Sequence, residues 1–183
     1  MLYIKEHFLT ITRHRHLVIK HCYKCGILWQ GLRHDLSKYS PTEFLEGIRY
    51  YRPDRSPNVG ARDANGYSRA WMHHQGRNRH HFEYWIDYNS KSKKREPVPM
   101  PVRYVVEMFC DRIAASKIYF GNEYDDSKTY MYFEKGKGKH YMHPRTASML
   151  KKLLIMLEKD GEEKTFAYIR SVVKPRAKAK HIW

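Results

Sequence analysis

Residues 3–28 read YIKEHFLTITRHRHLVIKHCYKCGIL, and their apolar side chains recur at nearly helical spacing. The apolar residues that lie near helical spacing are Phe8, Ile11, Val18, Cys22, Cys25 and Leu28. Such a period predicts a long amphipathic α-helix. Gly26 weakens the pattern near its end, and Gly31 is expected to open a turn.

Further helical patterns follow along the chain. Ser40-Pro41-Thr42-Glu43 predicts a helix start, because Ser40 can cap, Pro41 suits the first helical position and Glu43 can complete a capping box. Other helices are expected over residues 68–88, 101–121, 144–161 and 162–173, with loops over 52–66, 89–101 and 122–143. The loop over residues 122–143 is expected to contain at most one helical turn.

The fold class follows from these patterns, since no repeat and no convincing strand signal appears. We predict an all-α protein, a single-domain bundle of about six helices over residues 1–174. Residues 175–183, PRAKAKHIW, are predicted to form a basic, flexible tail.

The composition of the chain limits the classes of partner and the compartment that can be expected. The 183 residues carry a net charge of +16, which attracts anions such as phosphorylated small molecules and nucleic acid. No run of eighteen apolar residues and no signal-peptide centre appears, so no membrane partner is expected. Three cysteines, Cys22, Cys25 and Cys110, are too few for a disulfide framework, which predicts a reduced, cytoplasmic protein.

Histidines and aspartates recur in a distinctive order within the first 111 residues, and the chain has twelve histidines in all. Imidazole and carboxylate groups are the usual protein ligands of divalent metals. The sequence therefore predicts a centre of one or two ions, for which Mn, Fe, Co, Mg, Ni and Zn are all candidates. The candidate ligands are His14, His34, Asp35, His73, His74, His80, His81 and Asp111.

Three histidines, His14, His16 and His21, are candidates for the metal ligand nearest the N-terminus. His14 lies near His16 and His21, and the seven-residue spacing of His7, His14 and His21 places these three on one helical face. His34 and Asp35 are adjacent, so on a helix they would point about 100° apart and share an ion only at the edge between them.

Asp111 lies in an otherwise largely apolar helical stretch, where an inward carboxylate is costly unless it is paired or bound to a metal. An ion pair with Arg112 is the alternative. Glu107 shares the face of Asp111 and is expected to be a second ligand or a solvated side chain.

The two histidine pairs are seven residues apart, so one helix would stack His73 over His80 and His74 over His81. Three basic side chains are candidates for contacting phosphate: Lys38, one turn after Asp35, and Arg77 and Arg79, between the pairs. The aromatic residues interleaved with the pairs fit core packing better than base stacking.

The order His14, His34-Asp35, Asp111 resembles that of the HD-domain metal-dependent phosphohydrolases, an all-α superfamily. The resemblance covers roughly residues 10–120 and implies that these four residues bind metal. His34-Asp-Leu-Ser-Lys38 is similar to the signature of its cyclic-dinucleotide branch, which implies a phosphate contact for Lys38 and further ligands among the histidine pairs. The Gly-Tyr-Pro run of that branch does not follow the histidines, which argues against a cyclic dinucleotide substrate.

A closer resemblance covers the whole chain and is to a bacterial and phage family of unknown activity. Three stretches carry it: GLRHDLSKYSPTEF at residues 31–44, HHQGRNRHHFEYW at 73–85 and MPVRYVVEMFCD at 100–111.

The expected function is metal-dependent hydrolysis of a phosphoester, on a nucleotide or another phosphorylated small molecule. Two alternatives stay open. One is a non-catalytic module that binds nucleic acid or protein around a structural metal site, and the other is an HD-like metal oxygenase.

Overall fold

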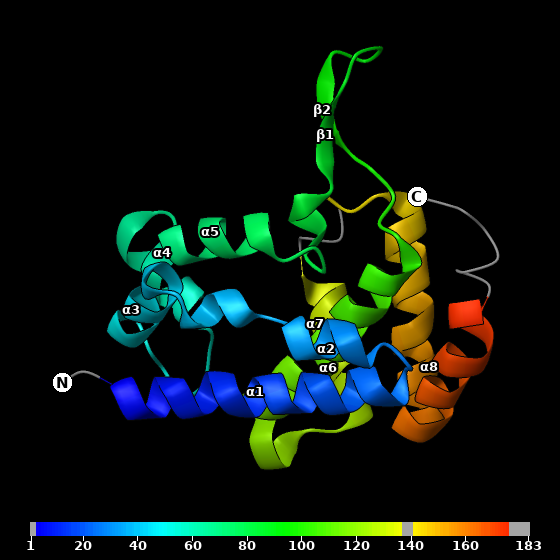
Figure 1. Ribbon diagram of the computed structural model, residues 1–183, viewed down its shortest axis with the longest axis horizontal. Helices are drawn as coiled ribbons and strands as arrows, with labels where there is room; N and C mark the ends of the chain where they lie inside the picture. Colours follow the sequence, from blue (N-terminus) through cyan, green and yellow to red (C-terminus); the bar gives the residue numbers. More distant parts are fainter. Residues whose placement is uncertain (1–2, 137–140, 176–183) are drawn as a thin grey trace.

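The computed structural model describes residues 3–136 and 141–175, and helices dominate it (Figure 1). In chain order the α-helices are α1 (Ile4–Lys24), α2 (Leu28–Arg33), α3 (Pro41–Arg49), α4 (Pro57–Asn65), α5 (Arg69–Arg77), α6 (Val102–Phe120), α7 (Asp126–Lys135) and α8 (Pro144–Tyr168). Short 3-10 helices are η1 (Leu36–Tyr39), η2 (Phe82–Tyr84) and η3 (Gly121–Glu123), and a π-helix is η5 (Ile169–Val173). The predicted all-α class is confirmed.

The hydrophobic core lies where α6 packs between α1 and α8. Helix α8 contributes four leucines that are buried in this core: Leu150, Leu153, Leu154 and Leu157. Helices α3, α4 and α5 gather over the N-terminal half of α1, and α8 stands at the opposite end (Figure 1). The middle of α1 therefore faces the space between these two groups.

Helix α1 ends at Lys24, four residues before its predicted end. Gly26 has φ +75°, a left-handed conformation that ends helices and that glycine adopts at little cost. The chain then turns back, and α2 packs very closely on α1. A Cβ at Gly31 would lie 2.7 Å from Cys22 Cβ, so only glycine fits this contact.

Two predicted loops contain helices. Residues 52–66 include α4, which begins at a Ser56-Pro57 pair and ends at Gly66 with φ +79°. Residues 122–143 include α7, whose N-cap Asp125 accepts a hydrogen bond from the Ser127 amide. Both predictions are therefore wrong. Both helices begin at residues that favour a helix start, but neither stretch shows the apolar period on which the helix predictions are based.

The predicted helix over residues 68–88 is also wrong. Helix α5 ends at Arg77, and the Asn78 side chain donates to the carbonyl oxygen of His74 at 2.9 Å, which caps the last turn. Antiparallel strands β1 (Ile86–Asn89) and β2 (Lys94–Pro97) follow and form a hairpin that projects from the helical body (Figure 1). Gly76 lies within α5, one residue before its end.

The two helices predicted for residues 144–161 and 162–173 meet at Gly161, whose φ of +79° breaks the helical path inside α8. The predicted tail, residues 175–183, lies outside the described residues apart from Pro175. Within residues 3–136 and 141–175, no helix combines the length and apolar character needed to cross a membrane.

Candidate metal centre

The His34-Asp35 doublet lies in the turn between α2 and η1 rather than within a helix. Asp35 has φ +54°, a left-handed conformation that is uncommon outside glycine but enriched in aspartate. This turn removes the 100° separation expected on a helix, and both side chains point into the same buried space. Each is 1% exposed.

One set of ligand atoms joins α1, the turn and α6. His14 Nε2 lies 3.0 Å from Asp111 Oδ1 and 3.8 Å from Asp35 Oδ2, and His34 Nε2 lies 3.2 Å from the same Asp35 oxygen. One ligand atom from each of His14, His34, Asp35 and Asp111 lies within 4.8 Å of every other. This spacing is compatible with one ion held by four side chains.

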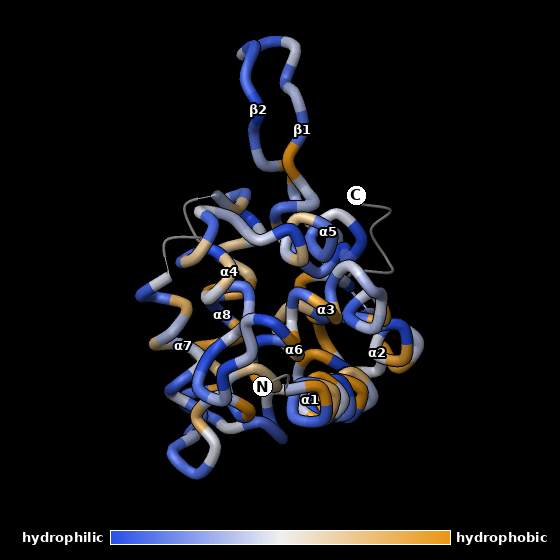
Figure 2. The backbone as a smooth tube through the Cα atoms, turned by 90° about the vertical axis from the view of Figure 1, so that its left-hand side faces the viewer, coloured by the Kyte–Doolittle hydropathy of each residue, from blue (hydrophilic) through white to orange (hydrophobic). Residues whose placement is uncertain are grey.

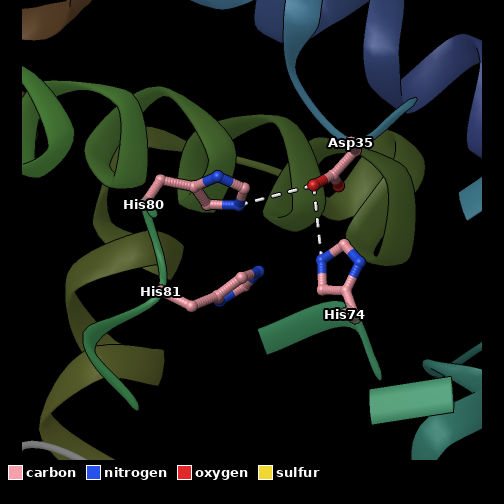
Figure 3. Close-up of side chains that lie close together, drawn as sticks. All are labelled: Asp35, His74, His80 and His81. Carbon is pink, nitrogen blue, oxygen red and sulfur yellow. Dashed lines mark ion pairs between the residues drawn. The ribbon is translucent and has the colours of Figure 1, made fainter. Parts of the chain in front are cut away.

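A second set shares Asp35 and adds histidines from the end of α5 and the following turn (Figure 3). His74 Nε2 and His80 Nε2 lie 3.3 and 3.5 Å from Asp35 Oδ1, and His81 completes the set. The two Asp35 oxygens therefore face different sets, with Oδ2 toward the first and Oδ1 toward the second. The break after Arg77 brings these three histidines together, which a continuous helix would not do.

Two buried glutamates orient the histidines from behind. Glu107 lies 3.1 Å from His34 Nδ1 and 3.3 Å from His80 Nδ1, and Glu43 lies 2.7 Å from His74 Nδ1. A carboxylate on Nδ1 fixes the tautomer that leaves Nε2 free to bind a metal. Glu107 is buried rather than solvated, and it lies behind both sets, where it also forms a third group of possible ligand atoms with His34 and His80.

Glu43 also corrects the predicted capping box. Its carboxylate contacts His73 Nδ1 at 2.6 Å as well as His74, and it does not reach back to Ser40. The Ser40 hydroxyl has no hydrogen-bond partner among the described residues. Only Pro41 at the start of α3 keeps its predicted role.

The chemistry of the donors fits a divalent cation. Six buried atoms that face one another lack a hydrogen bond of acceptable geometry among the described residues: the Nε2 atoms of His14, His34, His80 and His81 and both oxygens of Asp35. Buried polar atoms are rarely left unsatisfied, and each one costs free energy. Cations between these atoms would satisfy them all.

The protonation of the cluster supports the same fit. Burial alone would lower the pKa of His34, but the carboxylates of Asp35 and Asp111 raise it well above its usual value. Burial would also lower the pKa of His74, but the carboxylate of Asp35 raises it above its usual value. In contrast, burial lowers the pKa of His14 and of His81. Protons on His34 and His74 thus balance buried carboxylates in the metal-free protein, a role that cations take over on binding.

Lys38 extends from η1 to the edge of the cluster, where Nζ lies 2.7 Å from Asp35 Oδ2. Burial would lower its pKa, but Asp35 and Asp111 raise it above its usual value, so the ammonium stays charged. A cavity of about 490 Å³ opens beside it, lined in part by His14, Asp35, His74, His81 and Asp111. The ligand sets therefore face a space large enough for a small organic molecule.

The structure does not bring the two predicted arginines to this cavity. Arg77 and Arg79 are exposed and do not line the cavity, and Arg79 donates to the Tyr104 hydroxyl instead. Arg112 lines the cavity, and its buried Nε has no hydrogen-bond partner among the described residues. Asp111 faces His14 and His34 rather than pairing with Arg112.

The remaining candidate ligands, His16, His21 and His73, lie outside both sets. His73 contacts Glu43, and His16 is exposed on α1. His21 is buried against Phe166, with Nδ1 3.4 Å from the Cys110 carbonyl oxygen. Of the three candidates for the first ligand, only His14 therefore belongs to the cluster.

Fold and site together define an all-helical protein with a buried, carboxylate-backed histidine cluster beside a cavity. The chain belongs to a family of unknown function, DUF5662, whose model matches residues 3–156. The match includes every member of both ligand sets and agrees with the resemblance of the three quoted stretches to a family of unknown activity. Comparison with curated proteins and with solved structures found no significant match.

Proposed function

We propose that this protein is a metal-dependent phosphohydrolase that cleaves a phosphoester of a nucleotide or another phosphorylated small molecule. The observation that carries the proposal is the position of Asp35, whose two oxygens face two sets of histidine and carboxylate ligands beside a cavity. The resemblance of the same residues to the HD-domain phosphohydrolases supports it.

The two sets of ligands would hold two cations. His14, His34, Asp35 and Asp111 would hold one cation, and Asp35, His74, His80 and His81 a second. A divalent cation bound in such a site supplies Lewis-acid polarisation of phosphoryl oxygens and acidifies water; Mn, Fe, Co, Mg, Ni and Zn are the candidates.

Residues of the cavity would stabilise and complete the reaction. Lys38 and Arg112 place two cationic groups where charge develops on the phosphoryl oxygens. Water adds to phosphorus, the ester P–O bond breaks, and the leaving oxygen takes up a proton. Glu83 is a candidate donor, because it lines the cavity and burial raises its pKa.

The test combines metal analysis with an assay of phosphate release. Protein loaded with each candidate metal should release phosphate from nucleoside 5′-monophosphates or p-nitrophenyl phosphate. Asp35→Ala should lose both bound metal and turnover, because Asp35 belongs to both ligand sets. Asp54→Ala is the matched control, since Asp54 lines the same cavity with a side chain that is 72% exposed.

Two results would contradict the proposal. One is an Asp35→Ala protein, folded by circular dichroism, that keeps the full metal content of the wild type. The other is a fully loaded wild-type protein that releases no phosphate from any of these substrates, in which case the ions are structural.

A further inference from the structure

A second concave surface, separate from the metal centre, lies between α2, the start of α6, α8 and η5. Its volume is about 1640 Å³, and it shares no lining residue with the cavity beside the cluster. Small-molecule pockets usually enclose about 300–1,000 Å³. The size of this groove therefore suits a segment of a polymer better than a small ligand.

The charges of the groove all have one sign. Its lining contains no aspartate or glutamate and five cationic side chains: Arg79, Arg103, Arg145, Lys152 and Lys174. Within residues 3–136 and 141–175, none of the five forms an ion pair with a carboxylate. Unpaired cations around a concave surface attract a polyanion.

Aromatic rings alternate with these cations at one end of the groove. The Arg103 guanidinium lies 4.8 Å from the centre of the Tyr104 ring, whose centre is 5.6 Å from that of Trp85. Arg79 donates to the Tyr104 hydroxyl at 3.3 Å and accepts through its carbonyl oxygen from Trp85 Nε1 at 2.7 Å. The rings are therefore held in place before any ligand arrives.

Trp29 adds a freely accessible ring on the α2 side of the groove. It is 75% exposed, which is unusual for a tryptophan and leaves its face open to solvent. Flat aromatic faces next to cations are the recurrent means of binding unpaired bases, because every base can stack on them.

The β1–β2 hairpin extends the cationic surface. Trp85 and Pro99, which flank the hairpin, line the groove at its foot. The projecting hairpin is predominantly hydrophilic (Figure 2), and its exposed cationic side chains are Lys91, Lys93, Lys94 and Arg95. A chain lying in the groove could continue along this arm.

From these observations we infer that the groove binds single-stranded nucleic acid. Its cations would contact phosphates, and the exposed Trp29 would stack on bases. Tyr104 and Trp85, which pack against the core, hold Arg79 and Arg103 at the groove. An acidic peptide would use the cations but not the Trp29 ring, and a duplex hides the base faces that this ring requires. This inference does not depend on the metal centre.

Fluorescence anisotropy with labelled 20-nucleotide dT and U oligomers tests it, in EDTA so that no hydrolysis occurs. The double substitution Arg103→Ala/Lys152→Ala should weaken binding at least roughly tenfold and flatten the dependence of log Kd on log salt by about one. Arg13→Ala/Lys20→Ala is the control, because it removes the same charges from exposed positions of α1. A preference for dT or U would identify the strand as DNA or RNA.

Trp29→Ala should weaken binding by roughly fivefold or more at constant net charge, and Trp29→Phe should retain part of the affinity. The exposed Leu45, which lies outside the groove, gives the control Leu45→Ala. The inference is overturned if the control pair loses as much affinity as the groove pair, or if Trp29→Ala binds like wild type. It is also overturned if polyglutamate or a blunt duplex binds as tightly as the single strands.

Discussion

Asp35 combines a left-handed backbone conformation with a carboxylate whose oxygens face opposite ligand sets. Conformations of this kind cost roughly 1–3 kcal/mol and persist where the surroundings enforce them. Here the following turn holds it, since Lys38 N donates to the Asp35 carbonyl oxygen at 3.0 Å while its ammonium contacts the carboxylate. The unfavourable backbone conformation of Asp35 thus lowers local stability, but it orients the carboxylate toward the cluster.

Glu43 is expected to tune metal affinity without binding metal itself. In Glu43→Gln, one of the two oxygens that contact His73 and His74 becomes an amide group, so His74 loses its fixed tautomer. Loss of such an outer contact typically weakens metal binding roughly 10- to 100-fold. Isothermal titration with Mn²⁺ or Zn²⁺ measures the change, with Glu6→Gln as the exposed control on α1. An unchanged affinity would show that Glu43 does not position the cluster.

His7 is expected to make stability depend on pH. Burial, followed by the charge of Lys38, lowers its pKa to about 4, against about 6.5 when unfolded. Between these values the unfolded chain binds the proton and the folded one does not, so unfolding becomes easier as pH falls. The contribution reaches about 3 kcal/mol near pH 4.

Urea unfolding of the metal-free protein between pH 7 and 4 measures this loss. His7→Leu should reduce the pH dependence by the share of His7, since the lowered pKa values of His14, His21 and His81 also contribute. His16→Leu, at an exposed position of the same helix, should keep the full dependence. A wild-type slope in His7→Leu would rule out His7 as a source.

For single residues, the sequence predicts the candidate metal ligands better than the glutamates that contact them from behind. The resemblance in the order of His14, His34, Asp35 and Asp111 implies four ligands, and these are the members of the first set. Only Asp111 carries a signal of its own, because an inward carboxylate in a largely apolar helix is costly unless it is paired or bound to a metal. Glu43 reads as a capping residue, since its contacts with His73 and His74 come from another helix and leave no local signal.

Among the helices, the close contact of α2 with α1 sets the position of the His34-Asp35 turn. The interior of α2 holds Gly31 against Ile19 and Cys22, where any side chain would collide. A displaced α2 would carry the turn away from His14, so packing of these two helices and geometry of the site are coupled.

Gly31→Ala should therefore destabilise the protein by about 1–3 kcal/mol, the usual cost of overpacking, and weaken metal binding. Gly76→Ala is the matched control, because nothing lies within 4 Å of the added methyl group in α5. That change should stabilise by up to about 1 kcal/mol, since alanine favours the helix. Urea midpoints of the two variants give both values, and equal effects of the same sign would contradict the packing argument.

The start of α3 is predicted correctly, because Pro41 suits the first helical position and an apolar period follows it, although Ser40 makes no side-chain cap. The same Ser-Pro start at α4 lies in a polar stretch, and apolar spacing alone misses it. The β1–β2 hairpin has almost no apolar alternation, because most of its side chains face solvent. Its strands are held by backbone pairing, which the sequence pattern does not record.

Across the whole molecule, the ligands come from α1, the α2–η1 turn, the end of α5 and α6, although up to 97 residues separate them. The packing of α1 against α2 and α6, and of α5 against α3 and η1, brings them together. A bound metal would tie these elements to one another and stabilise the folded state by mass action.

The most direct test of this account is anomalous diffraction from crystals grown with Mn²⁺ and measured near the manganese absorption edge. The account predicts two peaks on opposite sides of the Asp35 carboxylate, one beside His14, His34 and Asp111, the other beside His74, His80 and His81. Peaks found only at surface carboxylates, with none inside the histidine cluster, would contradict it.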